Sequence, residues 1–243
     1  INLLNNSYIK LKDLTGSGVY TNFGDSPVPT RVTPNAYEDY PRISSSTFQQ
    51  SSSVGPVDVF NFTGAFNTFQ TDAGVLGGYA NTVNIVNQGA GKIRLNLQNN
   101  TVNVWNVAAA TLIGYTEISF NQAPSLSAPL LINVNGTGNV NWTLPTFPGV
   151  SDLQGPFMLW NFYNNTGTVT LNGGNTIPGT ILAPNTTLIK AGSGNIAGQI
   201  IVNNYDHVAG ELHYYPFESD LASEDVDCGC GNTLFTNGGF ETH

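Results

Sequence analysis

A near-repeat in the C-terminal half of the chain constrains its fold more than any other feature. Residues 177–185 read IPGTILAPN and residues 196–204 read IAGQIIVNN, so that corresponding residues lie 19 positions apart. Each copy is a short apolar run that is entered through a glycine and left through an asparagine, which is typical of a strand between turns. A fixed period of this size indicates stacked coils. The repeat therefore predicts a solenoid in which equivalent strands lie side by side and their apolar residues form ladders inside.

The segments upstream of the repeat are also dominated by predicted strands. Short runs that are apolar, or that alternate with polar residues, are separated by turn residues. They cover residues 83–86, 92–97, 102–107, 117–120, 129–134, 140–144, 157–162 and 168–171. Residues 57–81 have another period, because apolar residues from Phe62 to Ala80 recur at intervals of three and four, which predicts an amphipathic helix. We therefore expect a mainly β fold, a parallel β-helix with one flanking amphipathic α-helix.

The chain divides into segments of different composition. We expect residues 1–217 to form the solenoid domain, with residues 1–56 as its irregular N-terminal part or cap, because prolines are frequent there. Residues 218–231 are acidic and lack apolar periodicity, which indicates a linker. Residues 232–243 resemble the first strand of a further module. This organisation suggests a piece of a longer exported protein.

The charge balance excludes several classes of partner. Charged residues make up only 9% of the chain, and its net charge is −9. Such a chain would be repelled by nucleic acid and by an anionic membrane, so neither is an expected partner. No apolar run in the sequence approaches the length of a membrane span. The two cysteines, Cys228 and Cys230, are compatible with a strained ring, with free thiols or with pairing to cysteines elsewhere.

Two groups of residues carry metal-binding side chains, but neither has the spacing of a metal motif. Asp206, His207, Glu211 and His213 are close in sequence, yet they lack a His-x-x-x-His pair and a separate ligand segment. Polar residues at strand ends are therefore favoured over a metal or acid–base site. The acidic residues Glu224, Asp225 and Asp227 resemble half of a calcium loop, but Cys228 interrupts it. A solvated linker is favoured, calcium is an open alternative, and no other cofactor is expected.

Five residues are expected to contact a ligand. They are Trp142, Thr168, Thr170, Asp206 and His207. Trp105 and Trp160 lie inside apolar runs and are expected in the core, whereas Trp142 has polar neighbours and is the better candidate for an exposed sugar platform. Thr168 and Thr170 form a Thr-x-Thr pair of the kind that ice-binding faces repeat, although the sequence holds one such clean pair.

Motifs for catalysis are missing from the sequence. Gly192-Ser193-Gly194 is a turn and not a nucleophile elbow, and the few carboxylates are scattered along the chain. No catalytic residue is therefore predicted, and the chain is expected not to be an enzyme. The lysines invite one further comparison, since surface adhesins sometimes form Lys–Asn isopeptide bonds. Ordinary solvated lysines are favoured at Lys10, Lys12, Lys92 and Lys190.

The predicted Phe-rich helix is followed by a series of ordered motifs. They are NVWNVAAATL at 103–112, LLINVNG at 130–136, FMLWNF at 157–162, the two copies of the repeat and HYYPF at 213–217. With these motifs, the run from residue 57 to residue 217 resembles the choice-of-anchor A domain, an adhesive or collagen-binding-like domain of bacterial surface proteins, while residues 1–50 match poorly. The pattern is also similar to ice-binding solenoids, which implies a right-handed β-helix with a flanking helix.

The resemblance implies a non-enzymatic adhesion module of a large bacterial surface or secreted protein. The expected ligand is an extracellular protein or a glycan, and the expected state is a monomeric domain within a multidomain protein. Two alternatives remain open, an ice-binding-like solenoid and a structural spacer in a surface stalk. The family has no established catalytic residues that could be transferred to this chain.

Overall fold

The computed structural model describes residues 2–3, 8–56 and 61–221. The chain forms two compact units, Ile1–Gly64 and Ala65–His243. The boundary falls in the first turn of the long helix α2. The expected linker beyond Leu221 and the expected start of a further module at 232–243 lie outside the described residues.

The N-terminal unit contains a four-stranded sheet. Its elements are β1 (Asn2–Leu3), β2 (Gly18–Phe23), β3 (Ser26–Thr33), β4 (Ile43–Ser45) and α1 (Ser51–Val54). The strand order is β1-β4-β3-β2, and β2 and β3 form an antiparallel hairpin. The described part of residues 1–56 is therefore more regular than the irregular N-terminal part that the sequence predicts. Pro27 and Pro29 conceal a strand because they lie in the part of β3 that precedes its pairing with β4 at Arg31 and Val32.

A buried glutamine organises the small core of this unit. Ile9, Val32 and Val54 form its apolar centre. Beside them, the amide of Gln49 accepts a hydrogen bond from the Ile9 backbone N–H and donates one to the Ile9 carbonyl, both at 2.8 Å. These two bonds offset the free-energy cost of removing the amide from water. Gln49 thereby joins the segment before β2 to the segment after β4.

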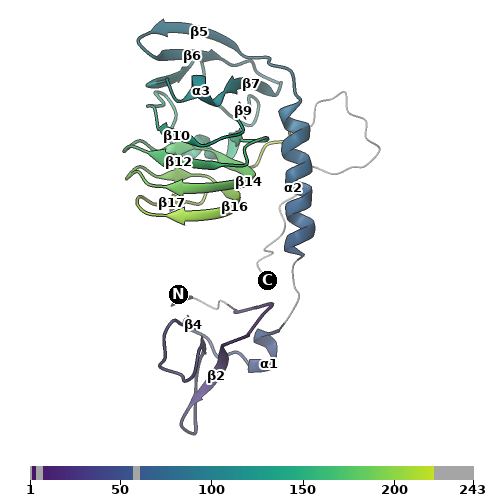
Figure 1. The fold of residues 1–243 in the computed structure, drawn as a ribbon, viewed down its shortest axis with the longest axis vertical. Helices are drawn as coiled ribbons and strands as arrows, with labels where there is room; N and C mark the ends of the chain where they lie inside the picture. Colours follow the sequence, from purple (N-terminus) through teal and green to yellow (C-terminus); the bar gives the residue numbers. More distant parts are fainter. Residues whose placement is uncertain (1, 4–7, 57–60, 222–243) are drawn as a thin grey trace. The chain divides into compact units, whose positions relative to one another are not determined.

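The C-terminal unit contains most of the regular structure (Figure 1). Its helices are α2 (Phe62–Gly77), α3 (Ala109–Leu112) and the 3-10 helix η1 (Asp152–Phe157). Its strands are β5 (Asn84–Gly89), β6 (Lys92–Asn96), β7 (Asn103–Ala108), β8 (Glu117–Phe120), β9 (Leu130–Asn135), β10 (Val140–Thr143), β11 (Met158–Asn161), β12 (Thr168–Asn172), β13 (Ile177–Pro178), β14 (Thr180–Lys190), β15 (Ile196–Ala197), β16 (Ile200–His207) and β17 (Leu212–His213). The strands predicted between residues 83 and 171 are confirmed, with ends that differ by a few residues.

Parallel strands dominate this unit and form a curled sheet. Its seven strands run in the order β10-β12-β14-β11-β9-β7, and β16 pairs with β14. The long strand β14 belongs to both halves, because its first residues pair with β11 and its last residues pair with β12. The register between β14 and β16 shifts between Ala183 and Thr187. Two smaller sheets complete the unit, β13-β15-β17 and β5-β6-β8.

The near-repeat is confirmed as a pair of stacked parallel segments. Ile177 lies opposite Ile196 in the pairing of β13 with β15, and Ile181 lies opposite Ile200 in the pairing of β14 with β16. The same 19-residue offset that is visible in the sequence is therefore the offset between neighbouring strands in space. The apolar side chains at these positions lie in ladders, as the repeat predicts. The fold is mainly β, with a curled parallel sheet.

The interior of the sheet is filled by large side chains in register. Trp105 pairs with Ile132, which pairs with Trp160, which pairs with Ile181, and all four side chains are buried. Each contributes about 1.5–3 kcal/mol by its removal from water. The indole N–H of Trp160 donates to the Pro178 carbonyl at 2.8 Å, so its polar atom is satisfied inside the core. The prediction that Trp105 and Trp160 are core residues is confirmed.

Helix α2 covers the opposite face of the same strands. It begins after Asn61, whose Oδ1 accepts a hydrogen bond from the Gly64 N–H at 2.9 Å. Its Ala73 and Leu76 are buried in a cluster with Val104, Leu131, Leu159 and Leu182. Figure 1 shows the helix running past the stacked strands. The amphipathic helix expected within 57–81 is thus confirmed, although it is shorter than predicted.

The acidic segment after residue 217 begins inside the packed unit. Phe217 and Leu221 belong to the apolar cluster under α2, and Leu221 is only 1% exposed. The side-chain amide oxygen of Gln199 accepts from the Phe217 N–H at 3.0 Å. The last described residues therefore pack against α2 and the sheet, and a linker beginning at residue 218 does not describe them.

An asparagine ladder joins helix α2 to the sheet. Asn106, Asn133 and Asn161 occupy equivalent positions on β7, β9 and β11. Asn161 donates to the Asn133 side-chain oxygen at 2.9 Å, and Asn133 donates to that of Asn106 at 3.0 Å. Each amide also donates to a backbone carbonyl of the helix or of the turn after it, at Ala73, Leu76 and Tyr79. The ladder fixes the position of α2 along the stack.

Candidate functional site

A polar surface lies on the outer side of β10, β12, β14 and β16. In β10, β12 and the second half of β14, buried residues alternate with residues that reach solvent, so the latter form one face, and β16 is exposed from Asn203 to His207. The outward side chains are Asn141, Thr143, Thr168, Thr170, Asn172, Thr187, Ile189, Asn204 and Asp206. We name this set the Thr/Asn face. Only Asp206 among these residues carries a charge.

The Thr/Asn face is regular because its strands are in register. Thr168 lies opposite Thr187, which lies opposite Asn204, and Thr170 lies between Asn141 and Ile189. Neighbouring rows in such a sheet are about 4.8 Å apart, and successive outward residues along a strand are about 6.6 Å apart. The Asn172 side chain donates to the Asn141 side chain across one row. The face therefore presents hydroxyl and amide groups at fixed spacings.

Two of the five expected ligand residues, Thr168 and Thr170, lie centrally on this face. Trp142 does not, and the expectation that it is exposed is wrong. Its side chain is 0% exposed and its ring lies 5.1 Å from that of Trp160, measured between ring centroids. In a strand, polar neighbours on both sides mean that a residue points to the other side of the sheet. Trp142 is consequently a core residue beneath the Thr/Asn face.

Asp206 and His207 lie on the exposed strand β16 but point to different sides. Asp206 is at the margin of the Thr/Asn face, opposite Ile189. His207 interacts with the Tyr205 hydroxyl through Nδ1 at 2.7 Å and with the Gly210 carbonyl through Nε2 at 2.9 Å. These contacts fix the imidazole within its own strand and turn. The sequence cluster of four residues is thus divided in space.

The other pair of that cluster, Glu211 and His213, joins a residue that the sequence did not suggest. His213 interacts with Glu211 Oε2 through Nε2 at 2.9 Å and with Asp152 Oδ2 through Nδ1 at 2.7 Å. Hydrogen bonds to Glu211 and then to Asp152 raise the pKa of His213 above its usual range. Asp152 is the first residue of the 3-10 helix η1. The capping box of Ser151 and Gln154 is the feature of the sequence that marks the start of this helix.

This arrangement fits a structural ion pair better than a catalytic or metal site. Both ring nitrogens of His213 are engaged by carboxylates, so neither is oriented toward a nucleophile. Within residues 2–3, 8–56 and 61–221, no group of three or more His, Cys, Asp or Glu side chains is placed to hold a metal ion. Strand-end polar residues were the favoured interpretation. The candidate calcium residues Glu224, Asp225 and Asp227, and both cysteines, lie outside the described residues.

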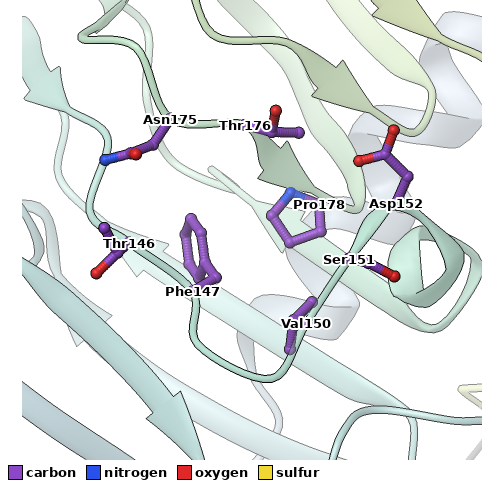
Figure 2. A pocket seen from close by; sticks show the side chains of 8 residues that line it. All are labelled: Thr146, Phe147, Val150, Ser151, Asp152, Asn175, Thr176 and Pro178. Atoms are coloured by element: carbon purple, nitrogen blue, oxygen red, sulfur yellow. The ribbon is translucent and has the colours of Figure 1, made fainter.

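A small pocket lies beside Asp152 (Figure 2). Its volume is about 180 Å³, below the roughly 300–1,000 Å³ of sites that enclose small molecules. Figure 2 shows Phe147, Val150 and Pro178 among polar residues that include Thr146, Asn175 and Thr176. The carboxylate of Asp152 is already paired with His213. The pocket is therefore too small to enclose a typical small-molecule ligand, and its charged group, the Asp152 carboxylate, already has a partner.

The lysines differ from one another in their surroundings. Lys92 forms an exposed ion pair with Glu117 at 3.1 Å. Lys190 is fully buried, so the expectation of an ordinary solvated lysine is wrong at this position. Its ammonium donates to the carbonyls of Gly192 and Ala209, and burial lowers its pKa. Both of these partners are peptide carbonyls, which cannot form an isopeptide bond with it.

Comparison with known families identifies the chain. A family model described as "Putative Ice-binding-like adhesive domain" matches residues 1–214. The chain belongs to this family. The ice-binding-like adhesive domain spans both units, including the first 50 residues, which fit the resemblance poorly. The adhesive class agrees with that resemblance, but the match is to this family and not to choice-of-anchor A specifically.

Further comparisons add no relative. No significant match was found among curated proteins or among solved structures. Among the helices of the described residues, none is long and apolar enough to cross a membrane.

Proposed function

We propose that this chain is a non-enzymatic adhesion domain that binds an extended extracellular ligand through the Thr/Asn face. The observation that carries the proposal is the in-register array of hydroxyl and amide groups on four neighbouring strands, from Asn141 to Asp206. Rigid polar groups bind with a small loss of conformational entropy, because short Thr and Asn side chains on a sheet have few rotamers to lose. The adhesive family supports the same function.

The charge of the surface favours neutral partners. The chain carries a net charge of −9, yet the Thr/Asn face contributes only Asp206 to it. A matrix protein or a glycan with hydroxyl and amide groups can bond to such a face without the desolvation of paired charges. The proposal includes a secreted or cell-surface location, a monomeric state and a sheet that is part of a right-handed β-helix.

A binding panel with one blocking variant tests the proposal. The purified chain is passed over immobilised collagens, other matrix proteins and glycans, first with calcium and then with chelator. Thr170→Tyr adds a large side chain at the centre of the face but keeps a residue that strands accept. It should weaken binding at least tenfold, about 1.4 kcal/mol. Thr71→Tyr, on the exposed side of α2, is the matched control.

Either of two results would reject the adhesion proposal. One is the absence of saturable binding across the panel, which would favour a structural spacer. The other is an equal loss for Thr170→Tyr and Thr71→Tyr, which would exclude the face as the binding surface. A response to chelator would instead implicate the acidic residues beyond Leu221.

Ice binding is the second candidate, because Thr168 and Thr187 are aligned on neighbouring strands and the family is described as ice-binding-like. The face departs from a regular threonine array, however, since Ile189 and Asn141 occupy the positions beside Thr170. Measurement of thermal hysteresis decides between the two functions. A hysteresis that Thr170→Tyr abolishes would replace adhesion with ice binding.

A further inference from the structure

The N-terminal unit contains a pocket that is separate from the Thr/Asn face. Its volume is about 490 Å³, which lies within the range of small-molecule sites. The lining residues are Asn2, Leu11, Asp13, Ser17, Val32, Tyr40, Pro41, Arg42 and Ile43. One part of this lining is apolar, and the other part offers a carboxylate, an amide, a hydroxyl and an aromatic ring. This combination has the chemistry of a site for a molecule with both hydroxyl groups and a C–H surface.

Tyr40 is an aromatic platform that is supported from one side. Its side chain is 71% exposed, and the guanidinium carbon of Arg42 lies 4.4 Å from its ring centroid. Arg42 is held in turn by Glu38 at 3.0 Å, and Glu38 also pairs with Arg31 at 2.7 Å. A stacked guanidinium and a ring attract each other, and the ion pairs restrict the arginine further. The open surface of Tyr40 is thus available for stacking at a low entropic cost.

Asp13 supplies an ionised acceptor to the same pocket. Its Oδ1 accepts from the Thr15 hydroxyl at 2.6 Å and from the Thr15 backbone N–H at 2.7 Å. These bonds lower the pKa of Asp13, with the hydroxyl bond as the largest cause. The Leu14 backbone N–H is a further donor to this carboxylate, and because an ionised carboxylate has about four acceptor positions, it can still accept from another donor. A fixed carboxylate oxygen beside a ring suits a vicinal pair of sugar hydroxyls.

We propose that this pocket binds one neutral sugar residue of a glycan. The sugar would place its C–H face on Tyr40 and donate hydroxyl hydrogen bonds to Asp13, with Ser17 and Asn2 as further polar partners. A neutral sugar is favoured over an acidic one, because the Asp13 carboxylate repels a uronate and the Arg42 guanidinium is already paired with Glu38. The site is independent of the Thr/Asn face in the other unit.

The experiment is an NMR titration of the full chain with single sugars. Glucose, galactose, mannose and N-acetylglucosamine are the neutral probes, and glucuronate is the acidic one. At least one neutral sugar should give saturable shifts at Tyr40 and Asp13 with a millimolar dissociation constant. Glucuronate should bind at least about tenfold more weakly, because of the carboxylate repulsion.

Three variants separate a sugar site from a structural role of its residues. Tyr40→Ala should abolish the titration, whereas Tyr40→Phe should retain it because the ring remains. Asp13→Asn, which keeps an oxygen for Thr15, should weaken it about tenfold. Tyr214→Ala is the matched control, since Tyr214 is 72% exposed but lies in the C-terminal unit.

The outcomes are distinct from those of the adhesion test. Thr170→Tyr should leave the sugar titration unchanged, so that failure of one site does not imply failure of the other. The proposal is overturned if no neutral sugar gives a saturable titration. It is also overturned if glucuronate binds as well as the neutral sugars, or if Tyr40→Ala and Asp13→Asn bind like the unmodified chain. Binding of a protein from the panel that Tyr40→Ala removes, without any sugar titration, would assign the pocket to a protein partner instead.

Discussion

Replacement of Asn133 by aspartate should expose how much the asparagine ladder contributes to stability. Asn133 is 1% exposed and uses its amide nitrogen twice, toward the Leu76 carbonyl at 2.7 Å and toward the Asn106 side-chain oxygen at 3.0 Å. Its own oxygen accepts from Asn161 at 2.9 Å. The change Asn133→Asp keeps the shape and the accepting oxygen but replaces the double donor with a second oxygen. That oxygen then faces two acceptors.

The magnitude follows from these contacts. Loss of two donated hydrogen bonds costs about 1 kcal/mol each. An ionised carboxylate that is buried without a cationic partner costs about 3–5 kcal/mol in comparable cases, and this figure includes the lost bonds. We therefore expect a destabilisation of about 3–5 kcal/mol at neutral pH, a large part of the roughly 5–15 kcal/mol that typical domains possess.

The destabilisation caused by Asn133→Asp should increase as pH rises. The new carboxyl group can escape part of the cost by protonation, so its pKa in the folded state is raised above the roughly 3.9 of an unfolded chain. The folded state then holds its proton more tightly, and the destabilisation grows as pH rises from the unfolded pKa to the folded pKa. At acidic pH the protonated group can again donate one bond to Leu76.

Urea denaturation followed by tryptophan fluorescence measures the effect. The chain contains 3 tryptophans, and Trp105, Trp142 and Trp160 all lie in the C-terminal unit, so the signal reports that unit alone. Asn135→Asp is the matched control, because Asn135 is exposed on the same strand and accepts from Asn164 at 2.7 Å, a role that a carboxylate retains. If both variants lie within about 0.5 kcal/mol of each other at neutral pH, the ladder has no structural role.

Three further outcomes are expected. Glu211 and Asp152 raise the pKa of His213, so the protonated imidazole stabilises the fold fully below the unfolded pKa near 6.5, and this stabilisation is lost as pH rises through the folded pKa. The melting temperature of His213→Gln should therefore vary less with pH between about pH 5 and pH 8 than that of the unmodified chain. Lys190→Ala should lower the free energy of unfolding in urea by about 2–5 kcal/mol, because it leaves a cavity and removes the donor to two carbonyls. Lys92→Ala should lower it by no more than about 1 kcal/mol, because its ion pair is exposed. Equal effects of the two variants would contradict the burial of Lys190. Intact mass spectrometry should give the mass of the sequence, and a deficit of one ammonia would reveal an isopeptide bond instead.

The mainly β fold and most of its strands were predictable from the sequence, because apolar periodicity determines which face of a strand is buried. The 19-residue offset was visible because the coils that follow β13 lack long insertions. The asparagine ladder was not predicted, since its members are 27 and 28 residues apart and the intervening loops differ. Asp152 was missed for a related reason, because 61 residues separate it from His213. The periodicity of a strand or of a repeat can be read directly from the sequence. Pairing between strands can be read from it only when the connecting loops have equal lengths, because the offset between paired residues is then constant.

Trp142 illustrates a different limit of the sequence. Its neighbours Asn141 and Thr143 are exposed, and this polar context suggested that the indole was exposed too. In a strand the same context implies the reverse, because successive side chains point to opposite faces. The prediction of an exposed Trp142 was wrong because it considered the polarity of the whole segment, whereas in a strand only every second residue shares a face. The structure moves the candidate site from the indole to the polar residues that flank it.

The polarity of the interior changes along the stack, and this change explains how the sheet can end at β16. In one column of paired residues, Trp142 is followed by Leu171, then by Lys190 and finally by His207. An apolar last strand would expose the core and offer an edge for aggregation. Instead, Lys190 bonds to backbone carbonyls and His207 contacts the Tyr205 hydroxyl and the Gly210 carbonyl. Water at the second half of β16 therefore meets satisfied polar groups, whereas Ile200 and Val202 at its start pack against the core. The Thr/Asn face, which lies along this second half, can thus extend to the last strand without exposing the core behind it.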